Sequence, residues 1–150
     1  MAEELTFNIL NIMTEFSTID IYGNPQTFQY VMDFNKLDNE VSFRVFSIPA
    51  NEMRWYSYRL KLLSKAIAKS EHISNNNCPE FSKMGIPERI IEIATQELNM
   101  DILSSPINPQ SGNFLIPASK KAWERLTLKN KNAHFDAEQG CFYFTKYEKI

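Results

Sequence analysis

"FSKMGIPERIIEIATQELNMDILSS" spans residues 81–105 and contains the pattern that decides the fold. It begins with a turn at Gly85, and Pro87 follows at a position that a helix tolerates in its first turn. Apolar residues then recur at helical spacing, which predicts a helix to about Leu98. "MDILSS" is short, apolar and ended by Pro106, so it predicts a buried strand. The expected inner side of the helix is Ile90, Ile91, Ile93, Ala94 and Leu98, and the expected outer side is Glu88, Arg89, Glu92, Gln96 and Glu97.

The residues after this unit continue the same alternation of helix and strand. "PASKKAWERLTLK", residues 117–129, predicts a second helix, with Ala122, Trp123, Leu126 and Leu128 on its inner side. "AHFDAEQGCFYFTKY", residues 133–147, predicts a final hairpin that turns at residues 136–140.

The first fifty residues predict strands. Residues 6–13 and 17–26 have strand patterns, and the second of these contains turn chemistry at Gly23, Asn24 and Pro25. Residues 27–34 and 41–48 flank the polar turn "NKLDNE". Alternation in "VSFRVFSI" places Val41, Phe43 and Val45 on one face. We therefore expect an antiparallel meander with one buried face.

The pattern changes at Asn51, a residue type typical of a helix N-cap. Spacings of three and four residues predict an amphipathic helix over residues 51–70. Its second face has two interpretations: a solvated helix surface, or a surface that binds a phosphate backbone or an acidic partner. The apolar stripe is Met53, Tyr56, Leu60, Leu63 and Ile67, and the basic stripe is Arg54, Tyr58, Lys61, Lys65, Lys69 and His72.

Length and charge limit the function classes. A chain of 150 residues is about the size of one domain, so we expect a single domain over residues 1–150. The net charge of −2 argues against coating nucleic acid through overall charge. Residues 1–50 hold two basic and seven acidic side chains, whereas residues 51–150 hold fourteen basic and eleven acidic side chains. Any anion-binding surface is therefore expected in the last two thirds.

Other patterns exclude further classes. Acidic residues precede the first apolar stretch, which is not typical of a secretory signal, and no apolar run approaches the roughly 20 residues that span a bilayer. We expect a cytoplasmic protein without a membrane partner. Cys78 and Cys141 are far apart, and the chain has only two histidines and no metal-binding motif, so we expect no metal site.

The turn before residues 86–98 has two interpretations. The first N–H groups of a helix are unpaired and its dipole is positive there, so a glycine turn in this position suits a phosphate group. The same turn also serves as an ordinary helix start, because glycine beside proline is common in turns. Pro87 removes one donor in either case.

The order of elements from residue 80 to 145 resembles the C-terminal half of the GNAT superfamily of N-acetyltransferases. In that family a turn written R/Q-x-x-G-x-G/A opens the helix that holds the pyrophosphate of acetyl-coenzyme A. The matching positions are Ser82, Lys83, Met84, Gly85, Ile86 and Pro87. Asn108 follows the strand "MDILSS", where the family often has an asparagine beside the pantetheine arm.

The resemblance implies an α+β fold with a mixed, mainly antiparallel sheet flanked by helices. It implies transfer of an acyl group from acetyl-coenzyme A to an amine, with both compounds as partners. Nucleic acid is a less favoured partner, expected only through the basic stripe. The cofactor-binding residues that it implies are Lys83, Met84, Gly85, Ile86, Glu88, Arg89 and Asn108.

Two alternatives remain open. Trp123 stands where the family often has a proton-donating tyrosine, and an indole does not deliver a proton at neutral pH, which favours an inactive GNAT-like module that binds through the basic helix. The third hypothesis is an unrelated α+β domain. The catalytic residues are left unassigned, and Glu52, His134 and Tyr143 are candidates for a general base that also have structural interpretations.

Overall fold

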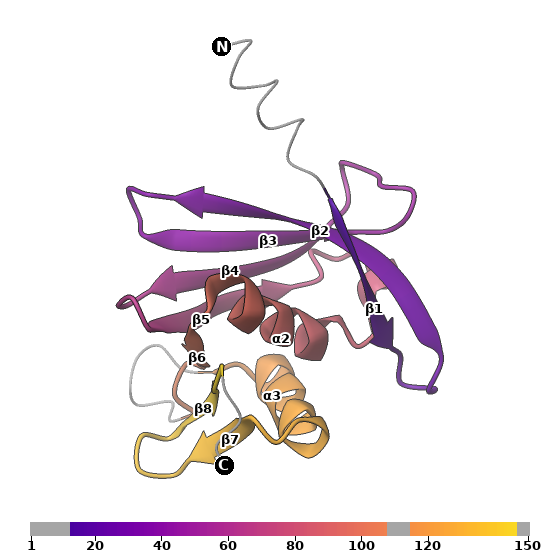
Figure 1. Cartoon of the computed structure of the whole chain (residues 1–150). Coiled ribbons are helices and arrows are strands. Elements are labelled where there is room, and N and C mark those ends of the chain that lie inside the picture. The colour runs from indigo at the N-terminus through magenta and orange to yellow at the C-terminus, as the bar shows by residue number, and fades with distance from the viewer. Residues whose placement is uncertain (1–12, 108–114, 147–150) are drawn as a thin grey trace.

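The computed structural model describes residues 13–107 and 115–146. Every strand in this part of the chain belongs to one open sheet of eight strands, and two α-helices accompany the sheet (Figure 1). The strands are β1 (Thr14–Ile19), β2 (Pro25–Asn35), β3 (Glu40–Phe46), β4 (Tyr56–Leu62), β5 (Ile67–Ser74), β6 (Asp101–Leu103), β7 (Ala133–Asp136) and β8 (Cys141–Phe144). The helices are the short 3-10 helix η1 (Pro79–Phe81), α2 (Ile86–Leu98) and α3 (Pro117–Lys129).

The strand order is β1-β2-β3-β4-β5-β6-β8-β7. Strands β1 to β5 form an antiparallel meander. The meander predicted for the first fifty residues is confirmed for β1, β2 and β3. Strand β6 is parallel to β5 because α2 carries the chain back across the sheet between them. Strand β8 then lies between β6 and β7 and is antiparallel to both. The fold is therefore α+β with a mixed, mainly antiparallel sheet.

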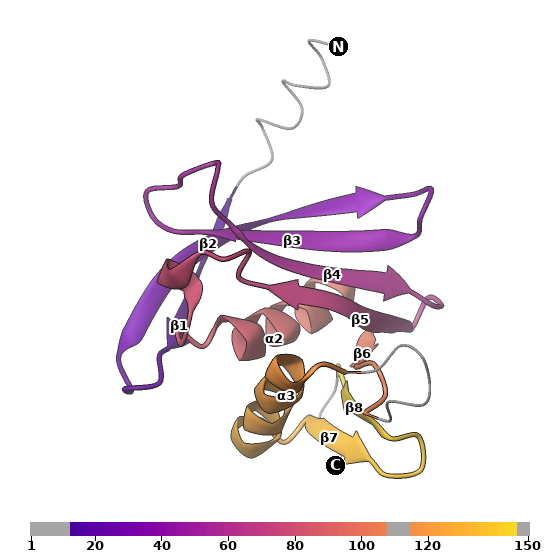
Figure 2. The same ribbon diagram turned by 180° about the vertical axis from the view of Figure 1, so that it is seen from behind.

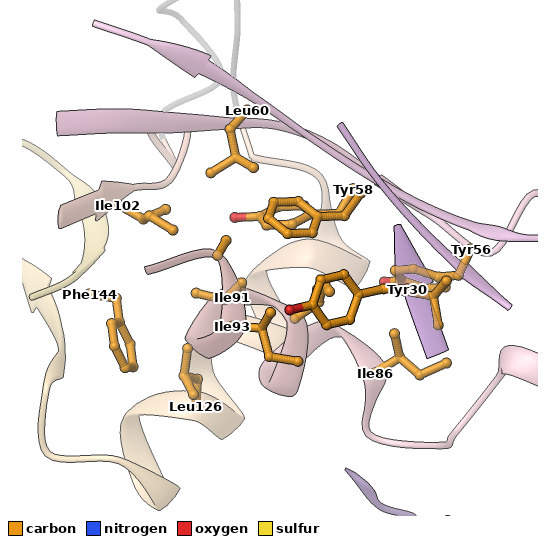
Figure 3. Packing of buried hydrophobic residues seen from close by; sticks show 14 of the residues in the cluster. Tyr30, Tyr56, Tyr58, Leu60, Ile86, Ile91, Ile93, Ile102, Leu126 and Phe144 are labelled. Atoms are coloured by element: carbon orange, nitrogen blue, oxygen red, sulfur yellow. The ribbon is translucent and has the colours of Figure 1, made fainter. Parts of the chain in front are cut away.

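The core lies between one face of the sheet and the two α-helices. Strand side chains alternate, and those of Phe43, Tyr58 and Leu60 are fully buried on the helical side. Helix α2 contributes a run of buried isoleucines, and α3 contributes Trp123, which stacks on Phe142 of β8 at 5.9 Å between ring centroids. Figure 3 shows side chains from the strands, α2 and α3 filling this space. Burial of one such apolar side chain is worth about 1.5–3 kcal/mol.

Residues 51–70 form no helix, and that prediction is wrong. Strand β4 and the start of β5 occupy this range and pair as a hairpin, which Figure 2 shows from the side opposite to Figure 1. The alternation Tyr56, Tyr58, Leu60 buries every second side chain of β4 against the core, and this period overrides the helical spacing. The turn between the strands has no glycine or proline, and the Ser64 hydroxyl accepts the N–H groups of Ala66 and Ile67 instead.

The basic stripe predicted for that helix does not exist as one surface. Tyr58 is fully buried, whereas Lys61 and Lys69 are paired neighbours on β4 and β5. Arg54 lies before β4 and donates two hydrogen bonds to Glu80 of η1, at 2.6 and 2.8 Å. This ion pair lowers the pKa of Glu80 to about 2.

The predictions for the C-terminal half are confirmed in most respects. Helix α2 ends at Leu98, α3 spans residues 117–129, and β7 and β8 form the final hairpin. Two placements are wrong: Leu128 is exposed, and Glu88 is buried although the helical pattern put it outside. The predicted strand at residues 6–13 lies outside the described residues except for Met13.

Strand β1 lies beside the first turns of α2. The long strand β2 curves, as Figure 1 shows, so that its partner β1 comes next to the helix. The guanidinium Nε of Arg89 donates to the carbonyl oxygen of Ser17 at 3.3 Å, and the N–H of Ile21 donates to the carbonyl oxygen of Lys83 at 3.1 Å. These contacts bring the β1–β2 loop to the turn that opens α2.

Candidate functional site

A cavity of about 990 Å³ lies where the start of α2, the end of β5, the β1–β2 loop and α3 meet. One side, here called the loop wall, consists of Ile19, Asp20, Ile21 and Gly23. A second group of lining residues, here called the helix wall, consists of Ala118, Lys121, Arg125 and Lys129 of α3. The other lining residues are Tyr56, Ile73, Ser74, Asn75, Phe81, Ser82, Lys83, Gly85, Pro87 and Glu88. Its size suits a ligand larger than a single small metabolite.

The cavity has an excess of positive charge. Its lining contains four basic side chains, Lys83, Lys121, Arg125 and Lys129, and two acidic ones, Asp20 and Glu88. The whole chain has the opposite balance, with a net charge of −2. A concentration of cations in a concave site of an acidic protein attracts anionic ligands.

The turn at Gly85 requires glycine because of its backbone conformation and its contact with Ile19, and not because of a ligand. Gly85 has a φ of 76°, and a Cβ added there would overlap the carbonyl oxygen of Ile19. Lys83 also has a positive φ, 60°, a conformation that costs a residue with a side chain about 1–2 kcal/mol. The backbone bond from Ile21 to Lys83 holds this turn in place.

Asp20 gives the loop wall its shape. Its carboxylate accepts hydrogen bonds from the N–H groups of Tyr22 and Asn24, both at 2.9 Å, and from the Gln26 side chain at 3.0 Å. The bond from Asn24 is the largest of the causes that lower the pKa of Asp20. Because its oxygens are occupied in this way, Asp20 serves as the structural centre of the loop.

Glu88 links α2 to the helix wall. It lies in the first turn of α2, where a negative charge is favourable, and its side chain is 7% exposed. Its Oε1 accepts hydrogen bonds from Nη2 and Nε of Arg125, at 2.9 and 3.2 Å. Nζ of Lys129 lies 3.7 Å from its Oε2. The two cations keep about half of their side chains exposed, so they face the cavity as well.

The end of β5 offers an unpaired strand edge. The parallel pairing with β6 covers three residues of β5, Ile67, Ala68 and Lys69. After Leu103 the chain turns toward β8, since the N–H of Ser104 donates to the carbonyl oxygen of Phe142 at 2.9 Å. Within the described residues, the part of β5 from residue 70 to 74 therefore has no strand on this side, and its end lines the cavity.

Tyr56 is the phenol of the cavity lining. It begins β4 and is 4% exposed, and its ring meets that of Phe81 edge to face at 6.4 Å. Burial, and next the neighbouring carboxylate of Glu88, raises the pKa of Tyr56 well above its usual range. The hydroxyl therefore carries its proton at neutral pH, and a protonated phenol can donate a hydrogen bond.

The residues expected to bind the cofactor do not all face the cavity. Lys83, Gly85 and Glu88 line it. Ile86 is fully buried, Met84 packs against the core, and Arg89 contacts β1 instead. Asn108 lies outside the described residues.

Sequence reasoning missed the helix wall, although a signal was present. Lys121, Arg125 and Lys129 recur every four residues, beside the apolar side of the predicted helix. It also missed Tyr56, which the helix prediction assigned to an apolar stripe. The general-base candidates Glu52, His134 and Tyr143 do not line the cavity, and His134 and Tyr143 pair across β7 and β8.

Comparison with models of known families, with curated proteins and with solved structures finds no match to this chain. Within the described residues, no helix combines the length and the apolar character needed to cross a membrane. In the same residues, no three histidine, cysteine or acidic side chains gather as metal ligands would.

Proposed function

We propose that this protein is a GNAT-like N-acyltransferase that moves the acetyl group of acetyl-coenzyme A to an amine. The observation that carries the proposal is the cation-rich cavity at the start of α2, beside the unpaired end of the parallel strand β5. The strand β5 also supports the proposal. The GNAT pattern has a strand before the glycine turn, whereas the residue spacing of this sequence had predicted a helix there. The crossover from β5 through α2 to the parallel strand β6 agrees with the same arrangement.

The cavity suits the two chemical halves of this cofactor. A diphosphate would lie against the first turn of α2, where the helix dipole is positive and Lys83 adds a charge. The pantetheine arm has amide groups, and an extended chain with amides pairs with an open strand edge as an additional strand does. The free edge of β5 from residue 70 to 74 offers such pairing.

The proposed reaction needs few side chains. A neutral amine attacks the thioester carbonyl carbon, the C–N bond forms, the C–S bond breaks, and the proton that the amine loses ends on the coenzyme A sulfur. We assign Tyr56 as a hydrogen-bond donor to the leaving sulfur, because it lines the cavity. Its raised pKa makes it a weak acid, so the proton passes from the amine to the sulfur without ionisation of the phenol. Orientation of the two reactants provides the rest of the acceleration.

Binding of acetyl-coenzyme A is the first test, measured by calorimetric titration. We expect saturable binding in the micromolar range, about −8 kcal/mol, and a loss of about tenfold in the Lys83→Glu variant. The matched control is Lys36→Glu, an exposed lysine in the turn between β2 and β3. Gly85 variants are unsuitable here, because a side chain at Gly85 meets Ile19 whether or not a ligand binds. Absence of binding at millimolar acetyl-coenzyme A would end the proposal.

Turnover is the second part of the test. Release of the coenzyme A thiol is followed with a panel of amines, in the wild type and in Tyr56→Phe. We expect the variant to bind acetyl-coenzyme A with unchanged affinity and to lose about tenfold in kcat, because one hydrogen bond to the leaving sulfur is removed. Equal kcat values in the two proteins would remove Tyr56 from the mechanism.

The alternative of a binding module that acts through a basic helix has lost its structural basis. Residues 56–62 and 67–70 belong to strands. Two cations of the predicted stripe form ion pairs, Arg54 with Glu80 and Lys69 with Glu71. No second function is therefore proposed.

A further inference from the structure

The cations of the cavity belong to two separate elements, α3 and the turn that opens α2. Lys121, Arg125 and Lys129 stand at intervals of four residues along α3, and all three line the cavity. Eight residues of helix extend about 12 Å. Lys83 adds a cation at the turn that opens α2. A ligand that satisfies the whole cavity therefore has anionic groups at two separate places.

Glu88 shows what kind of group the helix wall holds. One carboxylate oxygen accepts two hydrogen bonds from Arg125, and the other lies 3.7 Å from Nζ of Lys129. A planar guanidinium binds the oxygens of carboxylates and of phosphates with the same geometry. The oxygens of Glu88 thus lie against the same nitrogen atoms that phosphate oxygens would contact.

Lys121 lies at the start of this row. It is exposed, lines the cavity, and has no carboxylate within 4.0 Å in the part of the chain that the structure describes. The other acidic side chain of the lining, Asp20, accepts hydrogen bonds from its own loop. Within the described residues, the positive charge of Lys121 is therefore not balanced by a carboxylate.

We propose that Lys121, Arg125 and Lys129 form a phosphomonoester subsite that binds the 3′-phosphate of coenzyme A, separate from the diphosphate position at the turn. This inference rests on the proposed function and adds to it a preference for the 3′-phosphorylated cofactor. A phosphomonoester has a charge near −2 at neutral pH, so it competes with the single charge of Glu88 for Arg125 and Lys129. The ligand with this group binds more tightly than the ligand without it.

The test compares coenzyme A with 3′-dephospho-coenzyme A by calorimetric titration of the full chain at low salt. In the wild type we expect coenzyme A to bind about tenfold more tightly, as charge-assisted hydrogen bonds predict. In Lys121→Gln we expect that ratio to fall to about threefold, because one of three cations is absent. The control is Lys120→Gln, which removes the same charge from a neighbouring lysine that does not line the cavity, and we expect its ratio to equal that of the wild type.

Each outcome has a distinct meaning. Equal affinities for the two compounds in the wild type would overturn the subsite and leave cofactor binding at the turn intact. A fall in the ratio of the same size in Lys120→Gln and Lys121→Gln would also overturn it, because general charge would then explain the preference. Absence of binding of both compounds would overturn the proposed function together with the subsite.

Discussion

The two walls of the cavity are held by different forces. The loop wall is fixed by backbone contacts, namely the bond from Ile21 to Lys83 and the close approach of Ile19 to Gly85. In the helix wall, Trp123 and Leu126 anchor α3 in the core, and the bonds between Glu88 and Arg125 orient the charged side chain. Tightly packed backbone contacts tolerate little change in volume and respond weakly to salt, whereas an ion pair whose cation is half exposed is weakened by salt. One wall thus supplies shape and the other supplies an adjustable charge.

Adding a single methyl group at Gly85 should disrupt the contact between the loop wall and the turn. We expect this change to have the largest effect on stability. Gly85→Ala places a Cβ on the carbonyl oxygen of Ile19 at a positive φ. We expect a loss of about 3 kcal/mol in the free energy of unfolding, from backbone strain and overpacking together. Denaturant unfolding measures it.

Gly23→Ala is the matched control for that variant. Gly23 has a φ of 84°, but a Cβ there would meet nothing within 4 Å. We expect a loss of about 1 kcal/mol, which is the conformational part alone. Equal losses at Gly85 and Gly23 would contradict the view that β1 presses on the turn.

On the helix wall, the two measured properties should change in opposite directions. Glu88→Gln keeps the shape of the side chain but removes the charge that binds Arg125 and Lys129. We expect the free energy of unfolding to fall by about 1 kcal/mol, because both cations stay largely solvated. Affinity for coenzyme A should rise about threefold, since phosphate no longer competes with a carboxylate.

Glu92→Gln is the control for Glu88→Gln. Glu92 is also on α2 and accepts a hydrogen bond from Asn130 at 2.7 Å, but it does not line the cavity. Its affinity for coenzyme A should equal that of the wild type. A decrease of affinity in Glu88→Gln would mean that Glu88 orients the cations for the ligand and does not compete with it.

The smallest expected effect concerns a charge pair outside both walls. The Arg54 guanidinium lowers the pKa of Glu80 to about 2, against 4.5 for a free side chain. A carboxyl with a lowered pKa stabilises the folded state above its unfolded pKa, and this contribution is lost as the pH falls from about 4.5 toward 2. The difference in Tm between the wild type and Glu80→Gln should therefore be present at pH 6 and shrink below pH 4. A constant difference over that range would show that the ion pair contributes no pH-dependent stability.

The same division explains what the sequence could predict. Helices α2 and α3 and the final hairpin follow from local periodicity and turn residues, and so the turn at Gly85 was found. The four-residue spacing of the cations in the helix wall is visible in the sequence. Only the packing of α3 beside α2 shows that these cations line a cavity. The loop wall depends on the curvature of β2, a tertiary feature that no local pattern in residues 14–35 contains.

The hairpin of β4 and β5 shows why a clear pattern misled the prediction. Residues 56, 60, 63 and 67 fit a helical stripe, while residues 56, 58 and 60 fit a strand. Sheet pairing on both sides of β4 decides between them, because β3 and β5 supply partners for its backbone groups. Glu88 was misplaced for a related reason: Arg125, 37 residues away, makes its burial favourable.

The contact between β1 and α2 also has a consequence for folding kinetics. Most strands pair with their neighbours in the sequence, and such contacts close short loops. The bond from Arg89 to Ser17 joins residues 72 positions apart, so the loss of chain entropy on closing it is among the larger ones in the fold. We therefore expect the meander and the α2 unit to form first and the loop wall to dock last. Ligand-binding competence would then appear as the final, slowest phase of refolding.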